Sequence, residues 1–150
     1  MQPDHETLMR LALAQAALGR TAGEVPVGAI VALDGAVLGR GYNHPIGTCD
    51  PTAHAEVLAL REAGRAIGNY RLAGATLYVT VEPCLMCVGA IVHARVSTVV
   101  YGVADPKGGA VRSLLDPNVL PLNHRFEAVE GVLADECRQV LQEFFRLRRD

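Results

Sequence analysis

The chain has 150 residues, half of them hydrophobic, and a formal net charge of −2. This length suits one compact unit, so we expect residues 1–150 to form a single domain. The mild negative charge disfavours a protein that coats nucleic acid non-specifically, although a local basic patch stays compatible with it. No apolar run is long enough to cross a bilayer and the first residues lack a secretory pattern, so we expect a soluble, cytoplasmic protein. Thiols stay reduced there, which favours metal binding, catalysis or core packing for the four cysteines.

Predicted helices and strands alternate along the chain. Asp34-Gly35 lies between two apolar stretches and is a strong hairpin signal. Gly68-Asn69 ends a helical pattern, and Pro83 ends a strand and introduces the next helix. In chain order we expect a helix over residues 4–19, strands over 27–33 and 36–42, a helix over 53–66, a strand over 75–81, a helix over 84–94, strands over 98–103 and 126–131, and a helix over 135–149.

This order of elements predicts an α/β sandwich. The first two strands form a hairpin, so the sheet should be mixed. The connection between the last two strands, residues 105–123, is long enough for a parallel crossover.

Two short motifs carry the candidate chemistry, His54-Ala55-Glu56 and Pro83-Cys84-Leu85-Met86-Cys87. Each motif opens a predicted helix that follows extended chain. Because Cβ atoms tilt toward a helix N-terminus, first-turn side chains of two such helices can converge on one point. Cys84 and Cys87 are three residues apart and share a helix face, where the helix dipole stabilises thiolates.

One imidazole and two thiolates suit zinc by ligand type. Three protein ligands, His54, Cys84 and Cys87, leave a fourth tetrahedral position for water, whose pKa zinc lowers toward about 7. Glu56 lies close enough to reach that position without being a ligand. Its carboxylate can take the water proton and pass it on, first as general base and then as general acid.

Two other interpretations of the cysteines stay open at this point. A lone Cys-x-x-Cys after a strand also fits a thioredoxin-like redox pair, although His54 and Glu56 then have no role. A closed structural zinc site would need a fourth protein ligand, for which Cys49 and Cys137 are the spare thiols. Cys137 fits core packing better, and a closed site leaves Glu56 unexplained.

The spacing of His-x-Glu and Pro-Cys-x-x-Cys is the signature of zinc deaminases that act on nucleobases. Further segments extend the similarity over nearly the whole chain, and with them the sequence resembles the bacterial tRNA-specific adenosine deaminases. That family edits the wobble adenosine of an arginine tRNA to inosine. The segments are residues 24–29, 43–47, 50–56, 69–72, 75–80, 82–84, 123–125, 130–137 and 144–149.

The resemblance implies a three-layer α/β/α, cytidine-deaminase-like fold with a five-stranded mixed sheet. It also implies a homodimer, one Zn²⁺ per subunit and a tRNA anticodon stem-loop as partner. The adenosine would leave the stack at low cost in a single-stranded loop. Zinc hydroxide would attack C6 of adenine, while Glu56 would protonate N1 and then the departing ammonia.

The same resemblance implies contacts with the RNA. Asn43 would contact the flipped nucleoside, the Ala55 amide would donate to the base, and Asn123 would contact the base or its loop. Considered alone, Asn43 is also a normal turn residue. Further residues expected near the bound RNA, each of which would otherwise be an ordinary surface charge, are Asp105, Lys107 and Arg148.

Two rival functions share parts of this pattern. The first is a deaminase of a free base or nucleoside, such as guanine, cytosine or cytidine, which the same zinc site would serve. The second is a non-catalytic, zinc-stabilised RNA-binding module, against which Glu56 argues because binding needs no proton shuttle. The Asn43 and Asn123 loops and the basic last helix favour RNA.

Overall fold

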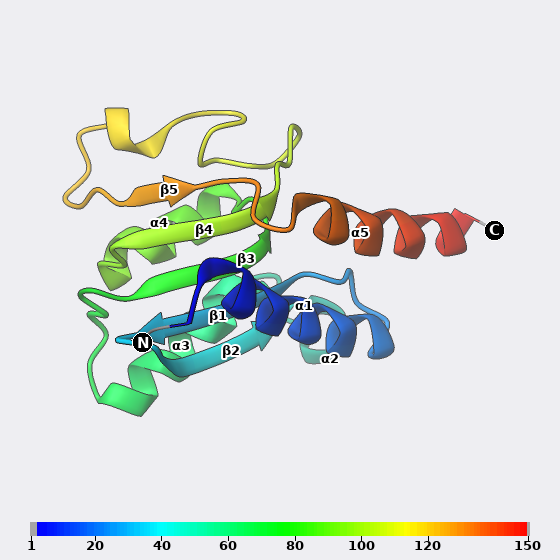
Figure 1. The fold of residues 1–150 in the computed structure, drawn as a ribbon, viewed down its shortest axis with the longest axis horizontal. Coiled ribbons are helices and arrows are strands. Elements are labelled where there is room, and N and C mark those ends of the chain that lie inside the picture. Colours follow the sequence, from blue (N-terminus) through cyan, green and yellow to red (C-terminus); the bar gives the residue numbers. More distant parts are fainter. Residues whose placement is uncertain (1–2, 150) are drawn as a thin grey trace.

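A five-stranded sheet runs through the centre of the computed structural model, which describes residues 3–149 (Figure 1). Met1, Gln2 and Asp150 of the expected domain lie outside the described residues. The strand order is β2-β1-β3-β4-β5. The strands are β1 (Gly28–Leu33), β2 (Ala36–Tyr42), β3 (Thr76–Val81), β4 (Thr98–Val103) and β5 (Glu127–Val129).

The sheet is mixed, as the sequence predicts. β1 pairs antiparallel with both β2 and β3, whereas β3, β4 and β5 are parallel to one another. The hairpin between β1 and β2 turns at Asp34 and Gly35, with φ values of 51° and 82°, as expected for a two-residue turn that matches the strand twist. The parallel crossover before β5 is also confirmed.

Helices cover both faces of the sheet, which confirms the three-layer α/β/α architecture (Figure 1). The short helix α2 was not predicted, whereas the sequence predicts one or two short helical turns over residues 105–123, where η1 lies. The helices are α1 (His5–Thr21), α2 (Pro45–Thr48), α3 (Ala55–Ile67), α4 (Leu85–Ala94), the 3₁₀ turn η1 (Pro117–Val119) and α5 (Ala134–Arg149).

Two hydrophobic clusters hold the layers together. One joins the sheet to α3 and α4 through residues such as Leu60 and Ile91. The other joins the opposite face to α1 and α5 through residues such as Met9 and Cys137. No helix within residues 3–149 has the length and hydropathy needed to span a membrane.

The start of α3 is positioned by two glycines of β2. A Cβ atom on Gly41 would lie 2.4 Å from the carbonyl oxygen of Ala55, and one on Gly39 would lie 2.2 Å from that of Ala59. The helix backbone therefore packs directly on the strand, at a distance that side chains in β2 would prevent. This contact sets the height of the first turn of α3 above the sheet.

Some element boundaries differ from those predicted. α3 begins at Ala55 rather than residue 53, because the amides of Ala53 and His54 bond back to Asp50 and Thr52 in a turn. β5 is shorter than the predicted 126–131, since Gly131 and Leu133 turn the chain with positive φ.

The outer edge of β5 is covered by side chains from the β4–β5 connection. Arg112 donates to the carbonyl oxygen of Ala128 at 3.1 Å. The Asn118 side chain pairs with both the amide and the carbonyl of Phe126, which precedes the strand. Three backbone groups along this edge, the Ala128 carbonyl and the Phe126 amide and carbonyl, therefore have partners within the chain.

Candidate metal and catalytic site

His54 and Cys84 occupy equivalent places in the fold, each at the N-cap of its helix. Both have extended backbone, with φ and ψ of −78° and 152° for His54 and −77° and 173° for Cys84. Within the described residues, neither side chain makes the capping hydrogen bond that is usual at this position. Both side chains are therefore available to a common partner.

The side chains of His54, Cys84 and Cys87 converge from α3 and α4. Their ligand atoms all lie within 4.8 Å of one another, and the Nδ1 atom of His54 is 3.5 Å from each sulfur. Zn–N bonds of about 2.0–2.1 Å and Zn–S bonds of about 2.3 Å at tetrahedral angles put nitrogen and sulfur about 3.6 Å apart. The donor set and its spacing thus fit one zinc ion bound through Nδ1 of the histidine.

The remaining thiols lie elsewhere. Cys49 is exposed at the end of α2, where its sulfur faces the carbonyl oxygen of Ile46, and Cys137 lies on α5 with its side chain buried in the core. Among residues 3–149, the convergent group contains no fourth protein ligand. The arrangement favours an open metal site over a closed structural one.

The two ligand thiols differ in acidity. A hydrogen bond from Cys87 is the main reason that the pKa of Cys84 falls to about 5, with His54 adding to the effect against the opposing influence of burial. The same hydrogen bond and burial raise the pKa of Cys87. Cys84 is therefore the thiol that ionises first and is best prepared to accept a cation.

Glu56 lies on the first turn of α3 and is 4% exposed. Burial is the main cause that raises the pKa of its carboxyl to about 7, and the Cys84 thiolate acts in the same direction. A carboxyl group with this pKa can both accept and release a proton near neutral pH. Glu56 lies beside the ligand group, and its role in proton transfer stays a prediction.

Asn43 and Ala55 contact each other directly. The side-chain oxygen of Asn43 accepts a hydrogen bond from the Ala55 amide at 2.8 Å. The loop of residues 43–54 is thereby closed onto the start of α3. Two residues predicted to contact the substrate therefore form one unit beside the metal ligands.

Glu82 supports the opposite wall of the site and was not singled out by the sequence analysis. It is 3% exposed and accepts hydrogen bonds from the amides of Asp105, Val111, Arg112 and Ser113 and from the Ser113 hydroxyl. These contacts fix the loop after β4 against the Pro83-Cys84 segment. The one feature of the sequence that could have indicated this structural role is the position of Glu82, a carboxylate between an apolar strand and the cysteine motif.

A cavity of about 1030 Å³ opens over the ligand group. Its inner part is formed by His54, Glu56 and Cys84, together with Asn43. Its outer part is lined by the loop after β4 and by one face of α5. The sequence had pointed to the last helix through its basic character and Arg148, but not to the residues of this face. The outer residues include Asp105, Lys107, Arg138, Gln142 and Phe145.

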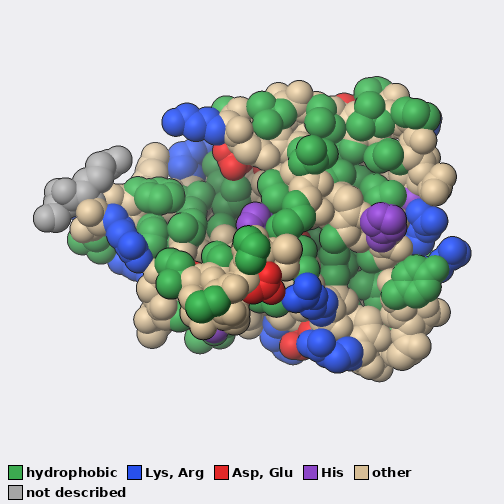
Figure 2. All heavy atoms as spheres, turned by 180° about the vertical axis from the view of Figure 1, so that it is seen from behind, with side chains coloured by type: hydrophobic (Ala, Val, Ile, Leu, Met, Phe, Trp, Pro, Cys, Tyr) green, Lys and Arg blue, Asp and Glu red, His purple; other side chains and the backbone are tan. Residues whose placement is uncertain are grey.

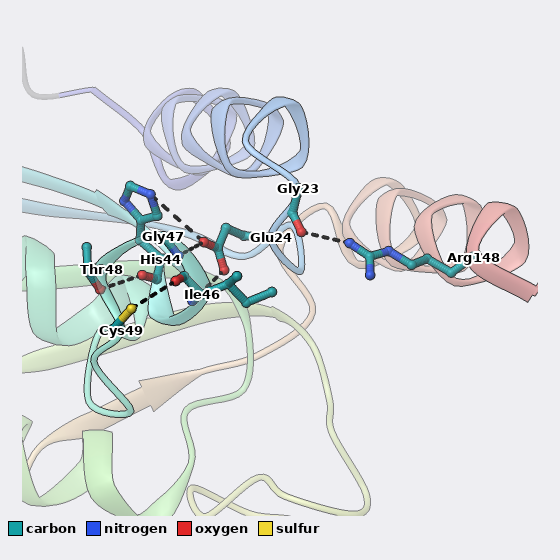
Figure 3. Close-up of polar contacts among 8 residues, drawn as sticks. All are labelled: Gly23, Glu24, His44, Ile46, Gly47, Thr48, Cys49 and Arg148. Atoms are coloured by element: carbon teal, nitrogen blue, oxygen red, sulfur yellow. Dashed lines mark hydrogen bonds and ion pairs between the residues drawn. The ribbon is translucent and has the colours of Figure 1, made fainter.

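Two residues predicted to contact RNA lie away from this cavity. Asn123 is exposed in the loop before β5 and is not among the residues that line the cavity. Arg148 donates to the carbonyl oxygen of Gly23 at 2.8 Å (Figure 3), and its guanidinium lies over the Phe144 ring at 4.8 Å. In this chain Arg148 thus ties α5 to the loop before β1, and its contact with RNA stays a prediction.

Comparisons with known proteins agree with this geometry. The chain matches the MafB19-like deaminase family over residues 3–149. It is 47% identical to the tRNA-specific adenosine deaminase of Haemophilus influenzae, over 97% of this chain and 85% of that protein. It is 45% identical to the tRNA-specific adenosine deaminase of Bacillus subtilis, over 94% and 88%. A solved structure from a study of A-to-I editing by tRNA:A34 deaminases aligns with a TM-score of 0.88 and 43% identity, over 90% of this chain and 99% of that one.

Proposed function

This chain belongs to the family of tRNA-specific adenosine deaminases, and we propose that it converts the wobble adenosine of an arginine tRNA to inosine, releasing ammonia. The observation that carries the proposal is the buried Glu56 carboxyl beside three convergent zinc ligands, at the inner end of a cavity. We expect the enzyme to act in the cytoplasm on the anticodon stem-loop.

His54, Cys84 and Cys87 would hold the zinc ion. Zinc supplies Lewis acidity, which lowers the pKa of a coordinated water to about 7. Glu56 accepts a proton from the attacking water and delivers it to N1 of adenine. The same carboxyl then carries the second proton to the departing amino group, so that water is consumed and ammonia is formed without net change in the charge of Glu56.

The remaining residues of the cavity would bind and orient the nucleoside. Asn43 retains its side-chain amino group for the substrate while its oxygen holds the Ala55 amide. Lys107 and Arg138 bring positive charge to the outer cavity, and Phe145 offers an aromatic face. Cations for phosphates and a ring for stacking suit a single-stranded RNA loop, in which bases are already partly unstacked.

The decisive test compares substrates. We expect the purified zinc-loaded protein to form inosine and ammonia from an arginine-tRNA anticodon stem-loop that carries adenosine at the wobble position. Free adenosine, cytidine and guanine serve as the comparison, and we expect no measurable turnover of them. Equal or faster deamination of a free nucleoside or base would reject the proposal in favour of a small-molecule deaminase.

We also propose that two copies of the chain associate through the α3–α4 side of the molecule. Figure 2, which views the molecule from behind Figure 1, shows hydrophobic side chains gathered on this side. A groove of about 620 Å³ between the two helices is lined by residues such as Leu60 and Ala90, and Tyr70 at its rim is 68% exposed. An apolar surface of this kind suits burial against a second copy.

Sedimentation equilibrium tests the dimer. We expect a dimer for the wild type and at least tenfold weaker association for Tyr70→Asp. Leu18→Asp is the matched control, because Leu18 is 53% exposed on α1, on the other face of the sheet. A monomeric wild type, or equal association of the two variants, would contradict this interface.

A further inference from the structure

A second buried carboxylate lies outside the metal group, in the loop between α1 and β1. Glu24 is 1% exposed. Its two oxygens accept hydrogen bonds from the amides of Ile46 at 3.1 Å and Gly47 at 2.8 Å (Figure 3). The proposed reaction gives this residue no task, and a charged group is seldom buried so completely without a partner-specific role.

Glu24 supplies the cap that the short helix α2 lacks. The N-cap residue of α2 is His44, and among the described contacts its side chain makes no capping hydrogen bond. The first-turn amides of Ile46 and Gly47 are satisfied instead by a carboxylate from a different loop. Glu24 therefore holds a segment that has too few residues to form a stable helix alone.

The packing around this contact is tight. The Nε2 atom of His44 lies 3.9 Å from Glu24 Oε2. A Cβ atom on Gly47 would lie 2.3 Å from His44 Nε2 and 3.3 Å from Glu24 Oε2. A side chain at position 47 would overlap the His44 ring and crowd the carboxylate, so glycine favours this close packing.

Both segments joined by Glu24 reach the cavity. On one side, Val25 and Val27, one and three residues after Glu24, line the cavity wall. On the other side, the loop of residues 43–54 carries Asn43 at its beginning and His54 at its end, and both line the cavity. The two sides also meet where the Asn43 amide donates to the Val27 carbonyl at 3.1 Å.

We propose that Glu24 is a positioning residue for substrate binding: it clamps the loop of residues 43–54 against the segment before β1, so that Asn43, held through its bond with the Ala55 amide, presents its amino group to the nucleoside. This inference rests on the proposed function. Loss of the carboxylate leaves the Ile46 and Gly47 amides without an acceptor, and the loop loosens. His54 is additionally held by the start of α3, so the proton transfer at Glu56 should be affected less than substrate binding.

The test uses Glu24→Gln and Glu24→Ala in the full-length zinc-loaded protein. The matched control is Asp4→Ala, because Asp4 also caps the first turn of a helix, accepting from the Thr7 amide at 2.8 Å. The N-terminus of α1 lies at the end of the sheet away from α5 (Figure 1), and Asp4, its N-cap, is not among the residues that line the cavity. We would measure kcat and KM on the anticodon stem-loop, zinc content and Tm.

We expect the KM of Glu24→Ala to rise about tenfold or more, that of Glu24→Gln to rise less, and kcat to change by less than about threefold. Zinc should stay at one per chain. Asp4→Ala should lower Tm with an unchanged KM, because Asp4 also caps a helix start but does not line the cavity. Unchanged KM in both Glu24 variants would overturn the inference, as would a loss confined to kcat.

A double-mutant cycle tests the route through Asn43. If Glu24 acts by holding Asn43, the effects of Glu24→Gln and Asn43→Ala on kcat/KM should be less than additive. Fully additive effects would overturn this route.

Amide hydrogen exchange gives a readout that needs no substrate. Glu24→Ala should speed exchange at Ala55, which bonds to Asn43, whereas Asp4→Ala should not. If the wild type failed to deaminate the stem-loop, the proposed function would be wrong. The positioning role of Glu24 would then be tested by the hydrogen exchange of the Ala55 amide alone. Unchanged protection of Ala55 in Glu24→Ala would overturn it.

Discussion

The Ala55 amide donates a hydrogen bond to the Asn43 side-chain oxygen at 2.8 Å, directly beside the metal-ligand group. This contact separates two tasks that one asparagine can perform. Its oxygen orders the start of α3, and its amino group is left for the substrate.

Substitution of Asn43 distinguishes these tasks. Asn43→Asp keeps an acceptor for the Ala55 amide but removes the amino donor, whereas Asn43→Ala removes both. We expect kcat/KM on the anticodon stem-loop to fall about tenfold or more in both variants, because the donor to the nucleoside is lost in each. Zinc content should stay unchanged. Near wild-type kcat/KM for Asn43→Asp would mean that only the contact with Ala55 matters.

Removal of the Glu56 carboxyl should abolish turnover but leave zinc binding unchanged. General acid–base groups contribute about 10²–10⁴-fold to rate, so Glu56→Ala should lose at least that much in kcat. Its zinc content, measured by elemental analysis, should match the wild type because Glu56 is not in the ligand group. Glu62→Ala, an exposed glutamate on the same helix, is the control and should be fully active. Substantial activity in Glu56→Ala would disprove its proton-transfer role.

Glu82 should make stability depend on acid pH. Burial alone would raise the pKa of its carboxyl, but hydrogen bonds from Arg112, Ser113 and Asp105 outweigh burial and lower the pKa below the ordinary value of 4.5. A carboxyl with a lowered pKa stabilises the fold above its unfolded-state pKa, and that contribution disappears as pH falls through the folded-state value.

The measurement is urea unfolding of wild type and Glu82→Gln at pH 7 and at pH values below 4.5. At pH 7 we expect the variant to be less stable by about 1–3 kcal/mol, because the neutral amide presents a donor and only one acceptor oxygen to the surrounding amides. The difference should shrink as the wild-type carboxylate becomes protonated. A gap that widened toward low pH would contradict the sign of the shift.

Lys107 should contribute electrostatically to RNA binding. It is exposed on the rim of the cavity. If it contacts one phosphate, Lys107→Ala should weaken binding of the stem-loop and reduce the slope of log K against log salt by about 0.7–0.9. Arg40→Ala, which removes an exposed cation from β2, should leave the slope unchanged. Equal slopes for wild type and Lys107→Ala would exclude a phosphate contact.

Cys49→Ser tests whether the exposed thiol has any share in metal binding. Because the sulfur of Cys49 faces the Ile46 carbonyl rather than the ligand group, zinc stoichiometry and kcat should equal those of the wild type. Cys87→Ser provides the comparison and should lose zinc. Loss of zinc from Cys49→Ser would instead support a closed structural site with Cys49 as the fourth ligand.

Much of the fold could be predicted because local signals were strong. The Asp34-Gly35 turn specified the hairpin, and the apolar runs of β3 and β4 indicated buried strands. The α2 helix was missed because its residues favour turns, and it is held by Glu24 from a distant loop. Contacts of this kind leave no periodic pattern in the sequence.

In the candidate site, too, the features set by local sequence could be predicted and those set by distant contacts could not. The convergence of His54, Cys84 and Cys87 followed from two helix starts and a three-residue spacing, both of which are local. The tether from Arg148 to Gly23 depends on how α5 is oriented relative to the loop before β1, which only tertiary packing determines. The outer wall of the cavity on α5 could not be predicted for the same reason.

The side chains of Arg112 and Asn118 along β5 have a consequence for assembly. A free strand edge is a template on which another chain can add a strand, and repeated addition leads to fibrils. Here an incoming strand would first have to displace the Arg112 contact with Ala128 and the Asn118 contacts with Phe126. Sheet extension is therefore obstructed at the β5 border, so that copies of the chain are hindered from joining edge to edge along this strand.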